Sequence, residues 1–256
     1  MSFRGQVVYV TGSGSGMGRL AAQRMADAGA QVAAIDVNEA GLKETALGRS
    51  GIHRFVLDAA DTRAVEANVR EVEASLGPIH RVYAAAAILK TELLLAQTTA
   101  DIFHIMDVNY RGVVNVAKAI LPGMLARGRG DLIHFASLAG WAPAPLFGAY
   151  CASKHAVVAF SEVLAHENRG RGVRFSCVCP PSVDTPMIAA TKVDSKALRH
   201  PRLPPITPEA VLDAIERDLE RGRLFCFPDR KSRISWRLRR FAPRLLWAAA
   251  HRMEGI

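Results

Sequence analysis

The chain has 256 residues, of which 50% are hydrophobic and 22% are charged, a composition typical of a globular protein and not of a disordered or fibrous one. No stretch approaches the roughly 20 apolar residues that a membrane-spanning helix needs. The N-terminal MSFRGQVVYV lacks a basic-then-apolar leader, so we expect no secretory signal. The four cysteines lack metal-site spacing, and we expect reduced, buried thiols in a cytoplasmic protein and no metal.

The net charge of +9 is concentrated near the C-terminus. Residues 229–256 contain eight Lys or Arg and two acids, a net charge of +6, which leaves only +3 for residues 1–228. We therefore expect a domain over residues 1–228, followed by a basic extension over residues 229–256. No nucleic-acid motif is present, and no basic region lies outside this extension, so nucleic-acid binding is not expected.

Strand-like and helix-like stretches alternate along the chain. Strands are predicted at QVVYV, QVAAI, IHRFVL, in the apolar run RVYAAAAILK at residues 81–90, and at DLIHFAS, VRFSCV and LFCF. Helices are predicted over residues 16–28, 62–76, 101–125, 150–168 and 208–221. This alternation implies right-handed crossovers, and it predicts a single doubly wound parallel sheet of about seven strands with helices on both faces.

A glycine-rich segment, TGSGSGMG at residues 11–18, joins the first predicted strand to the first predicted helix. In this context glycines turn the chain tightly, let the backbone approach a pyrophosphate, and pack helix against strand. The helix N-terminus adds free amides for the phosphates. Asp36 ends the second strand, where a carboxylate accepts both ribose hydroxyls of an adenosine and repels a 2′-phosphate. The pattern favours NAD over NADP.

Ser137, Tyr150 and Lys154 are the candidate chemical groups. Tyr150 and Lys154 are four residues apart, which places them on one face of a helix. A phenol has a pKa near ~10, too high for a base at neutral pH. A neighbouring ammonium and a positively charged nicotinamide would lower that pKa, and Ser137 can hydrogen-bond the reacting oxygen.

Taken together, these motifs resemble the short-chain dehydrogenase/reductase family over about residues 5–187. Further matching motifs are LDAAD around Asp58, NY at Asn109, and PPSVDTPM from Pro180. The resemblance implies a Rossmann-type fold and an NAD-dependent alcohol dehydrogenase or ketone reductase, assembled as a homodimer or homotetramer.

The resemblance also implies roles for individual residues. Tyr150 is the expected acid/base, Lys154 lowers its pKa and holds the nicotinamide ribose, and Ser137 polarises the substrate oxygen. Asn109 supports a water-linked proton path to Lys154. Cofactor contacts are expected from Gly12, Ser15, Gly16, Met17, Gly18, Asp36, Val37, Asp58, Ala59, Ala85, Ala86, Tyr150, Lys154, Pro180, Val183 and Thr185.

The chain departs from the family pattern at two places. Ala84 to Ala87 stand where the family usually reads NNAG. Alanines keep the strand end small enough for a cofactor to approach but remove bracing amides, at a cost on the order of 1 kcal/mol per lost bond. Either the change is tolerated in a supporting element, which we favour, or the cofactor site is weakened. Pro181 replaces a glycine and removes a backbone donor.

An apolar group of residues is expected to wall the substrate, namely Trp141, Phe147 and Met187, with residues 186–205 as a lid. Such a pocket suits a hydrophobic secondary alcohol or ketone, such as a steroid, a lipid-derived ketone or an aryl alcohol.

The basic extension has helical periodicity. Ile234, Leu238, Phe241 and Leu245 repeat every three or four residues, beside a parallel stripe of arginines, with Trp236 and Trp247 as amphipathic anchors. Pro243 is expected to kink or divide the helix. Peripheral attachment to an anionic membrane and packing on this domain or a neighbouring subunit both remain open. Two alternative functions follow: a membrane-surface steroid or ketolipid reductase, and a catalytically weak NAD-binding scaffold.

Overall fold

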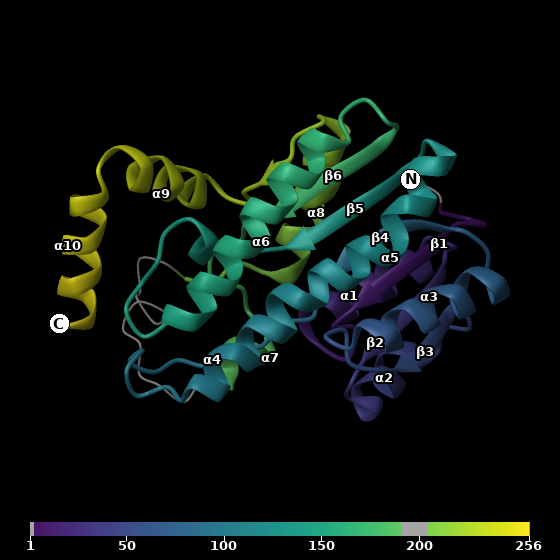
Figure 1. Cartoon of the computed structure of the whole chain (residues 1–256), viewed down its shortest axis with the longest axis horizontal. Coiled ribbons are helices and arrows are strands. Elements are labelled where there is room, and N and C mark those ends of the chain that lie inside the picture. The colour runs from purple at the N-terminus through teal and green to yellow at the C-terminus, as the bar shows by residue number, and fades with distance from the viewer. Residues whose placement is uncertain (1–2, 191–203, 256) are drawn as a thin grey trace.

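One sheet of seven parallel strands organises the described part of the chain, residues 3–190 and 204–255 of the computed structural model (Figure 1). The strands are β1 (Val7–Thr11), β2 (Gln31–Asp36), β3 (Ile52–Val56), β4 (Ile79–Ala84), β5 (Gly130–Phe135), β6 (Val173–Val178) and β7 (Phe225–Cys226). Their order is β3-β2-β1-β4-β5-β6-β7, so the direction of winding reverses between β1 and β4. Doubly wound sheets bind ligands at this reversal, beyond the carboxyl ends of the strands.

Helices cover both faces of the sheet, which confirms the predicted fold class. The larger helices of the body are α1 (Gly16–Asp27), α2 (Glu39–Ala46), α3 (Thr62–Ser75), α4 (Thr99–Met106), α5 (Gly112–Arg127), α6 (Gly148–Glu167) and α8 (Pro208–Glu220). Along β1, Val7 and Tyr9 pack on α3 and α5, whereas Val8 and Val10 pack toward α1 and α8. Successive strand residues point to opposite faces, so the sheet has two hydrophobic cores.

Two local features differ from the sequence prediction. The helix expected over residues 101–125 is interrupted by a π-helical segment, Asp107–Arg111, between α4 and α5. Such segments are rare and occur often at functional sites. Helix α2 was not predicted; the side chain of Asn38 caps it by accepting a hydrogen bond from the Gly41 amide at 3.0 Å.

The basic extension forms two helices, α9 (Arg230–Phe241) and α10 (Pro243–Glu254), divided at Pro243 as predicted. They form an arm at one end of the long axis of the molecule (Figure 1). Among the described residues, no helix is both long and apolar enough to cross a membrane. The expected lid contributes the short helix α7 (Pro186–Ala189), but residues 191–203 of it lie outside the described part of the chain.

Candidate functional site

The glycine-rich loop after β1 is packed so closely that side chains do not fit. Gly12 has φ +70°, and a Cβ placed on it would lie 2.7 Å from the amide nitrogen of Ala86. A Cβ on Gly18 would lie 2.1 Å from the carbonyl oxygen of Gly12. The first contact sets the loop against the alanine run after β4, and the second sets α1 against the loop. Glycine at both positions is therefore required by the geometry.

Asp36 is held at the end of β2 by two backbone amides. Its carboxylate accepts hydrogen bonds from Gly14 at 2.8 Å and from Asn38 at 2.9 Å. Arg19 lies on the other side of Gly14, where its guanidinium donates to the Gly14 carbonyl and pairs with Glu44 at 2.9 Å. The loop and the carboxylate thus form one connected unit.

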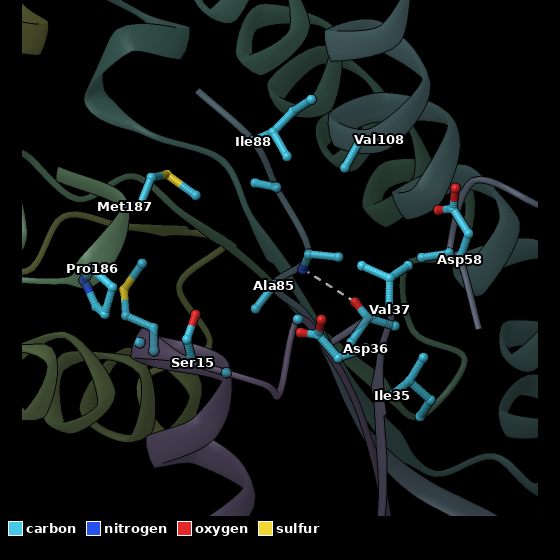
Figure 2. Close-up of a pocket in the computed structure, with 18 of the residues that line it drawn as sticks. Ser15, Ile35, Asp36, Val37, Asp58, Ala85, Ile88, Val108, Pro186 and Met187 are labelled. Carbon is cyan, nitrogen blue, oxygen red and sulfur yellow. Dashed lines mark hydrogen bonds between the residues drawn. The ribbon is translucent and has the colours of Figure 1, made fainter. Parts of the chain in front are cut away.

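A cavity of about 440 Å³ opens beside this unit, beyond the ends of β1, β2 and β4. Figure 2 shows Asp36 and Asp58 on one side of it and Ser15, Pro186 and Met187 on the other. Of the residues predicted to contact a cofactor, those that line this cavity are Gly12, Ser15, Gly16, Met17, Gly18, Asp36, Val37, Asp58, Ala59, Ala85, Ala86 and Thr185. Met187, predicted at the substrate, lines this cavity instead.

Other predicted cofactor residues lie outside the lining. Val183 is buried and pairs with Ile206 in an isolated bridge. The carbonyl of Pro180 accepts a hydrogen bond from the Leu138 amide at 2.8 Å. Six further residues line the cavity without having been predicted from the sequence: Ile35, Leu57, Ala87, Ile88, His104 and Val108. Adjacency to the predicted Asp36, Asp58, Ala86 and Asn109 was the only available signal for most of them.

The alanine run is braced by neighbours instead of by its own side chains. The Ala86 amide donates to the hydroxyl of Thr11 at 3.3 Å. Asn109, in the π-helical segment, clamps the next residue, Ile88: its Oδ1 accepts from the Ile88 amide at 2.7 Å, and its Nδ2 donates to the Ile88 carbonyl at 3.0 Å. These bonds fix the segment in the absence of asparagine side chains.

The structure brings Ser137, Tyr150 and Lys154 together beyond the end of β5. Ser137 begins a short 3-10 turn and accepts a hydrogen bond from the Ala139 amide at 3.1 Å. Tyr150 and Lys154 lie one turn apart on α6, with Lys154 Nζ 5.7 Å from the centre of the phenol ring. Nζ donates to the carbonyl of Phe135 at 2.7 Å. Asn109 Nδ2 also donates to Ser153 Oγ at 3.0 Å, beside Lys154 in the chain.

Burial dominates the proton affinities of these groups. It raises the pKa of Tyr150 to about 12, although a hydrogen bond with Ser137 acts in the opposite direction. Burial lowers the pKa of Lys154 to about 8, because the charged form is desolvated. In the protein alone Tyr150 is thus a neutral phenol near pH 7. The lower Tyr150 pKa inferred from the sequence stays a prediction for the complex with a positively charged nicotinamide.

A second cavity, of about 250 Å³, has Ser137 and Tyr150 in its wall. Its remaining lining is Leu89, Leu138, Ala139, Ala142, Ala144, Phe147, Cys151, Pro181, Ser182, Ile188, Pro204, Asp229, Lys231, Ser232 and Ser235. Phe147 therefore lies where a substrate residue was predicted. Ile88 and Met187 line the first cavity while their chain neighbours Leu89 and Ile188 line the second, so the two cavities adjoin.

Trp141, the third predicted substrate residue, lies outside the lining of this cavity. Its indole N–H donates to Cys179 Sγ at 3.3 Å, and its ring packs edge-on against Phe225 at 5.1 Å and Trp236 at 5.8 Å. It therefore ties α9 to the sheet. In return α9 supplies three of the lining residues and Asp229, its N-cap, a fourth, which no pattern in the sequence indicated.

Comparison with known proteins identifies the family of the chain. The profile of the short chain dehydrogenase family matches residues 6–196. The chain belongs to this family. Among the short-chain dehydrogenases, estradiol 17-beta-dehydrogenase 11 of Homo sapiens is 32% identical over 194 residues, which cover 73% of this chain and 65% of the relative. The chain thus spans somewhat less than two thirds of that relative.

Solved short-chain dehydrogenases have the same fold over nearly the whole chain. A family member from Burkholderia phymatum, solved in complex with NAD, superposes with a TM-score of 0.85 at 25% identity and covers 96% of both chains. Levodione reductase superposes with a TM-score of 0.79 at 25% identity, covering 89% of this chain and 97% of the other. The coverage of 96% extends the structural likeness well beyond the residues matched by the family profile.

Proposed function

We propose that this short-chain dehydrogenase is an oxidoreductase that uses a nicotinamide cofactor, NAD in preference to NADP, to interconvert a hydrophobic secondary alcohol and its ketone. One observation supports this proposal above others: a cavity lined by the glycine-rich loop and Asp36 adjoins a cavity walled by Ser137 and Tyr150. A cofactor in the first and a substrate in the second would meet at their common border.

The residues of the first cavity fit a dinucleotide. The missing side chains at Gly12 and Gly18 leave backbone where a pyrophosphate would approach, at the N-terminus of α1. Asp36 would accept the ribose hydroxyls of the adenosine and would repel a 2′-phosphate. When bound, the nicotinamide supplies the hydride acceptor or donor. The structure of the Burkholderia relative with NAD supports this assignment.

The protein's own groups would manage the substrate oxygen and its proton. Ser137 Oγ and the Tyr150 hydroxyl would bind that oxygen from two sides. In reduction, neutral Tyr150 gives its proton to the developing alkoxide; in oxidation, the phenolate takes the proton back. The Lys154 ammonium, held by the Phe135 carbonyl, stabilises the phenolate form. Asn109 fixes the backbone on the cofactor side through Ile88.

The second cavity favours a hydrophobic substrate. Leu89, Leu138, Phe147 and Ile188 form much of its wall, while Ser137 and Tyr150 place polar atoms at one point. A relative named as an estradiol dehydrogenase supports the alcohol and ketone class. We include a cytoplasmic location and a homodimer or homotetramer in the proposal; sedimentation of the purified chain tests the assembly.

The test is a titration with NADH and, separately, NADPH, followed by turnover with a panel of hydrophobic ketones. We expect NADH to saturate at lower concentration. Tyr150→Phe should keep NADH binding and lose at least about a thousandfold in kcat, because it removes the proton donor. Tyr110→Phe is the matched control and should keep turnover, because the Tyr110 ring packs on Phe160 and Tyr110 lines neither cavity. Saturable NADH binding with equal, residual turnover in both variants would favour the scaffold alternative.

A further inference from the structure

Helix α9 has two opposite faces, and the inner one is committed to the body of the protein. Ser232 is fully buried, and Ser235 lines the second cavity. Trp236 stacks on Phe227 with ring centres 5.3 Å apart and packs edge-on against Trp141. This face forms part of the wall of the second cavity.

The outer face carries apolar side chains in solvent. Ile234 is 51% exposed, Leu238 is 42% exposed and Phe241 is 80% exposed. At about 100° of rotation per residue, these three lie within a sector of about 60°, roughly opposite Ser232 and Trp236. A helix that only packed on its own domain would turn its apolar stripe inward. The orientation of this stripe therefore indicates a second, external apolar environment.

Arginines flank the outer stripe along one side. Arg230, Arg233, Arg237 and Arg240 lie in the neighbouring sector of the helix, and in the described ranges none of these four makes an ion pair. A second copy of the chain seated on the same face would bring two such basic stripes together, which is unfavourable. An anionic phospholipid surface offers apolar chains for the stripe and negative headgroups for the arginines.

We propose that the outer face of α9 binds the surface of an anionic phospholipid bilayer. Because the inner face of the same helix lines the second cavity, binding keeps that cavity close to the bilayer, with α9 between the two. This consequence rests on the proposed function: a hydrophobic alcohol or ketone dissolved in the lipid would be next to the site that converts it. The bilayer contact itself depends only on the outer face.

The experiment is flotation of the purified full chain with vesicles of phosphatidylcholine alone or of phosphatidylcholine mixed with phosphatidylserine. Wild type is expected to float with the anionic vesicles, to be released by salt, and to remain unbound with neutral ones. The double variant Leu238→Ser/Phe241→Ser should lose at least about tenfold in vesicle affinity, since it removes two apolar groups that would be buried in the bilayer. Leu47→Ser, at an exposed leucine directly after α2, should bind as wild type.

A second pair of variants tests the charges. Arg237→Gln/Arg240→Gln should lose about tenfold or more in affinity, and Arg63→Gln/Arg70→Gln, two exposed arginines on α3, should not. Equal binding to neutral and anionic vesicles, or unchanged binding of Leu238→Ser/Phe241→Ser, would overturn the proposal. The proposal would also be overturned if sedimentation showed a dimer for wild type and a monomer for this double variant, because a second copy of the chain would then occupy the face.

The outcome is separable from the proposed function. NADH titration and turnover of a water-soluble ketone, both without vesicles, report the enzyme alone and should be unchanged in Leu238→Ser/Phe241→Ser. Vesicle binding by a protein that turns over no ketone would leave the membrane contact standing and the enzyme proposal overturned. Turnover without vesicle binding would give the opposite result.

Discussion

Gly12 and Ala86 approach so closely that a Cβ on Gly12 would meet the Ala86 amide nitrogen at 2.7 Å. The same amide donates to Thr11, so it cannot move without losing that bond. The floor of the first cavity is thus a contact between two backbones, and the chain achieves it with alanines where its family usually has asparagines.

Gly12→Ala should weaken NADH binding by at least about tenfold, because the loop must shift away from Ala86 and the left-handed backbone of Gly12 is also strained. Gly48→Ala is the matched control: its φ is +72°, and nothing lies within 4 Å of the added Cβ. It should cost about 1–2 kcal/mol of unfolding free energy from backbone strain alone and leave NADH affinity unchanged. Fluorescence titration measures NADH affinity and urea unfolding measures stability. Equal losses of NADH affinity in Gly12→Ala and Gly48→Ala would contradict a role for the contact between Gly12 and Ala86.

Asp36 is predicted to select the cofactor. In Asp36→Asn the remaining side-chain oxygen can keep one of the bonds to Gly14 or Asn38, but the negative charge is lost. We expect about tenfold weaker NADH binding and a smaller difference between NADH and NADPH affinities. Glu66→Gln, at an exposed position on α3, is the control. An unchanged ratio of the two dissociation constants would show that selection lies elsewhere.

Burial of the charged Lys154 should lower the unfolding free energy of the protein. Its folded pKa is about 8, below the unfolded value of 10.5, so between these pH values the unfolded chain binds the extra proton and wild-type stability rises with pH. Lys154→Met removes the buried charge but also the bond to Phe135. It should raise the unfolding free energy by about 1–3 kcal/mol at pH 7 and lose turnover.

The gain in Lys154→Met should shrink as pH rises from about 8 to 10.5, because the wild-type lysine becomes neutral there in both states. Urea unfolding of the two proteins across this range measures the difference. Tyr150 is present in both, so its own titration cancels. A gain that stays constant with pH would mean that the lysine is not titrating near 8.

Burial of His134 should make the stability of the fold sensitive to acid. This histidine in β5 is buried against Phe160, with Nδ1 2.8 Å from Ser161 Oγ, and burial lowers its pKa to about 4. The unfolded chain takes up the proton near pH 6.5, so this group's contribution to stability is lost as pH falls from about 6.5 to 4, by roughly 3 kcal/mol at most.

His134→Phe should flatten the dependence of stability on pH between these values, because the buried residue at this position can then no longer take up a proton on unfolding. Ser161 keeps a partner, since its hydroxyl donates to the Val157 carbonyl at 2.6 Å. His166→Phe, at an exposed histidine, should leave the profile unchanged. Thermal unfolding at a series of pH values is the measurement, and parallel profiles for wild type and His134→Phe would contradict the assignment.

Local rules account for what the sequence predicted well. A strand, a glycine-rich turn and a helix in succession determine the loop at residues 11–18, and alternation of strands and helices determines the parallel sheet. The spacing of Tyr150 and Lys154 is a helical repeat, which needs no tertiary information. Asp36 follows from its place at the end of a strand.

Tertiary contacts decided the rest. Trp141 follows Ser137 closely in the chain, which suggested a substrate role, but its partner is Trp236 in the distant basic extension. The same packing brings Ser232 and Ser235 to the second cavity. No residue pattern in the sequence indicated the π-helical turn that aims Asn109 at Ile88. None of these contacts follows from a periodic pattern in the sequence.

If hydride passes between a nicotinamide and a substrate carbon, an isotope carried by the cofactor must appear in the product. The protein would be incubated with NADH carrying deuterium at both C4 positions and with a hydrophobic ketone, and the alcohol analysed by mass spectrometry. We predict one deuterium on the carbinol carbon with wild type and Tyr110→Phe, and none above background with Tyr150→Phe. Alcohol formed without deuterium, or equal labelling by Tyr150→Phe, would contradict it.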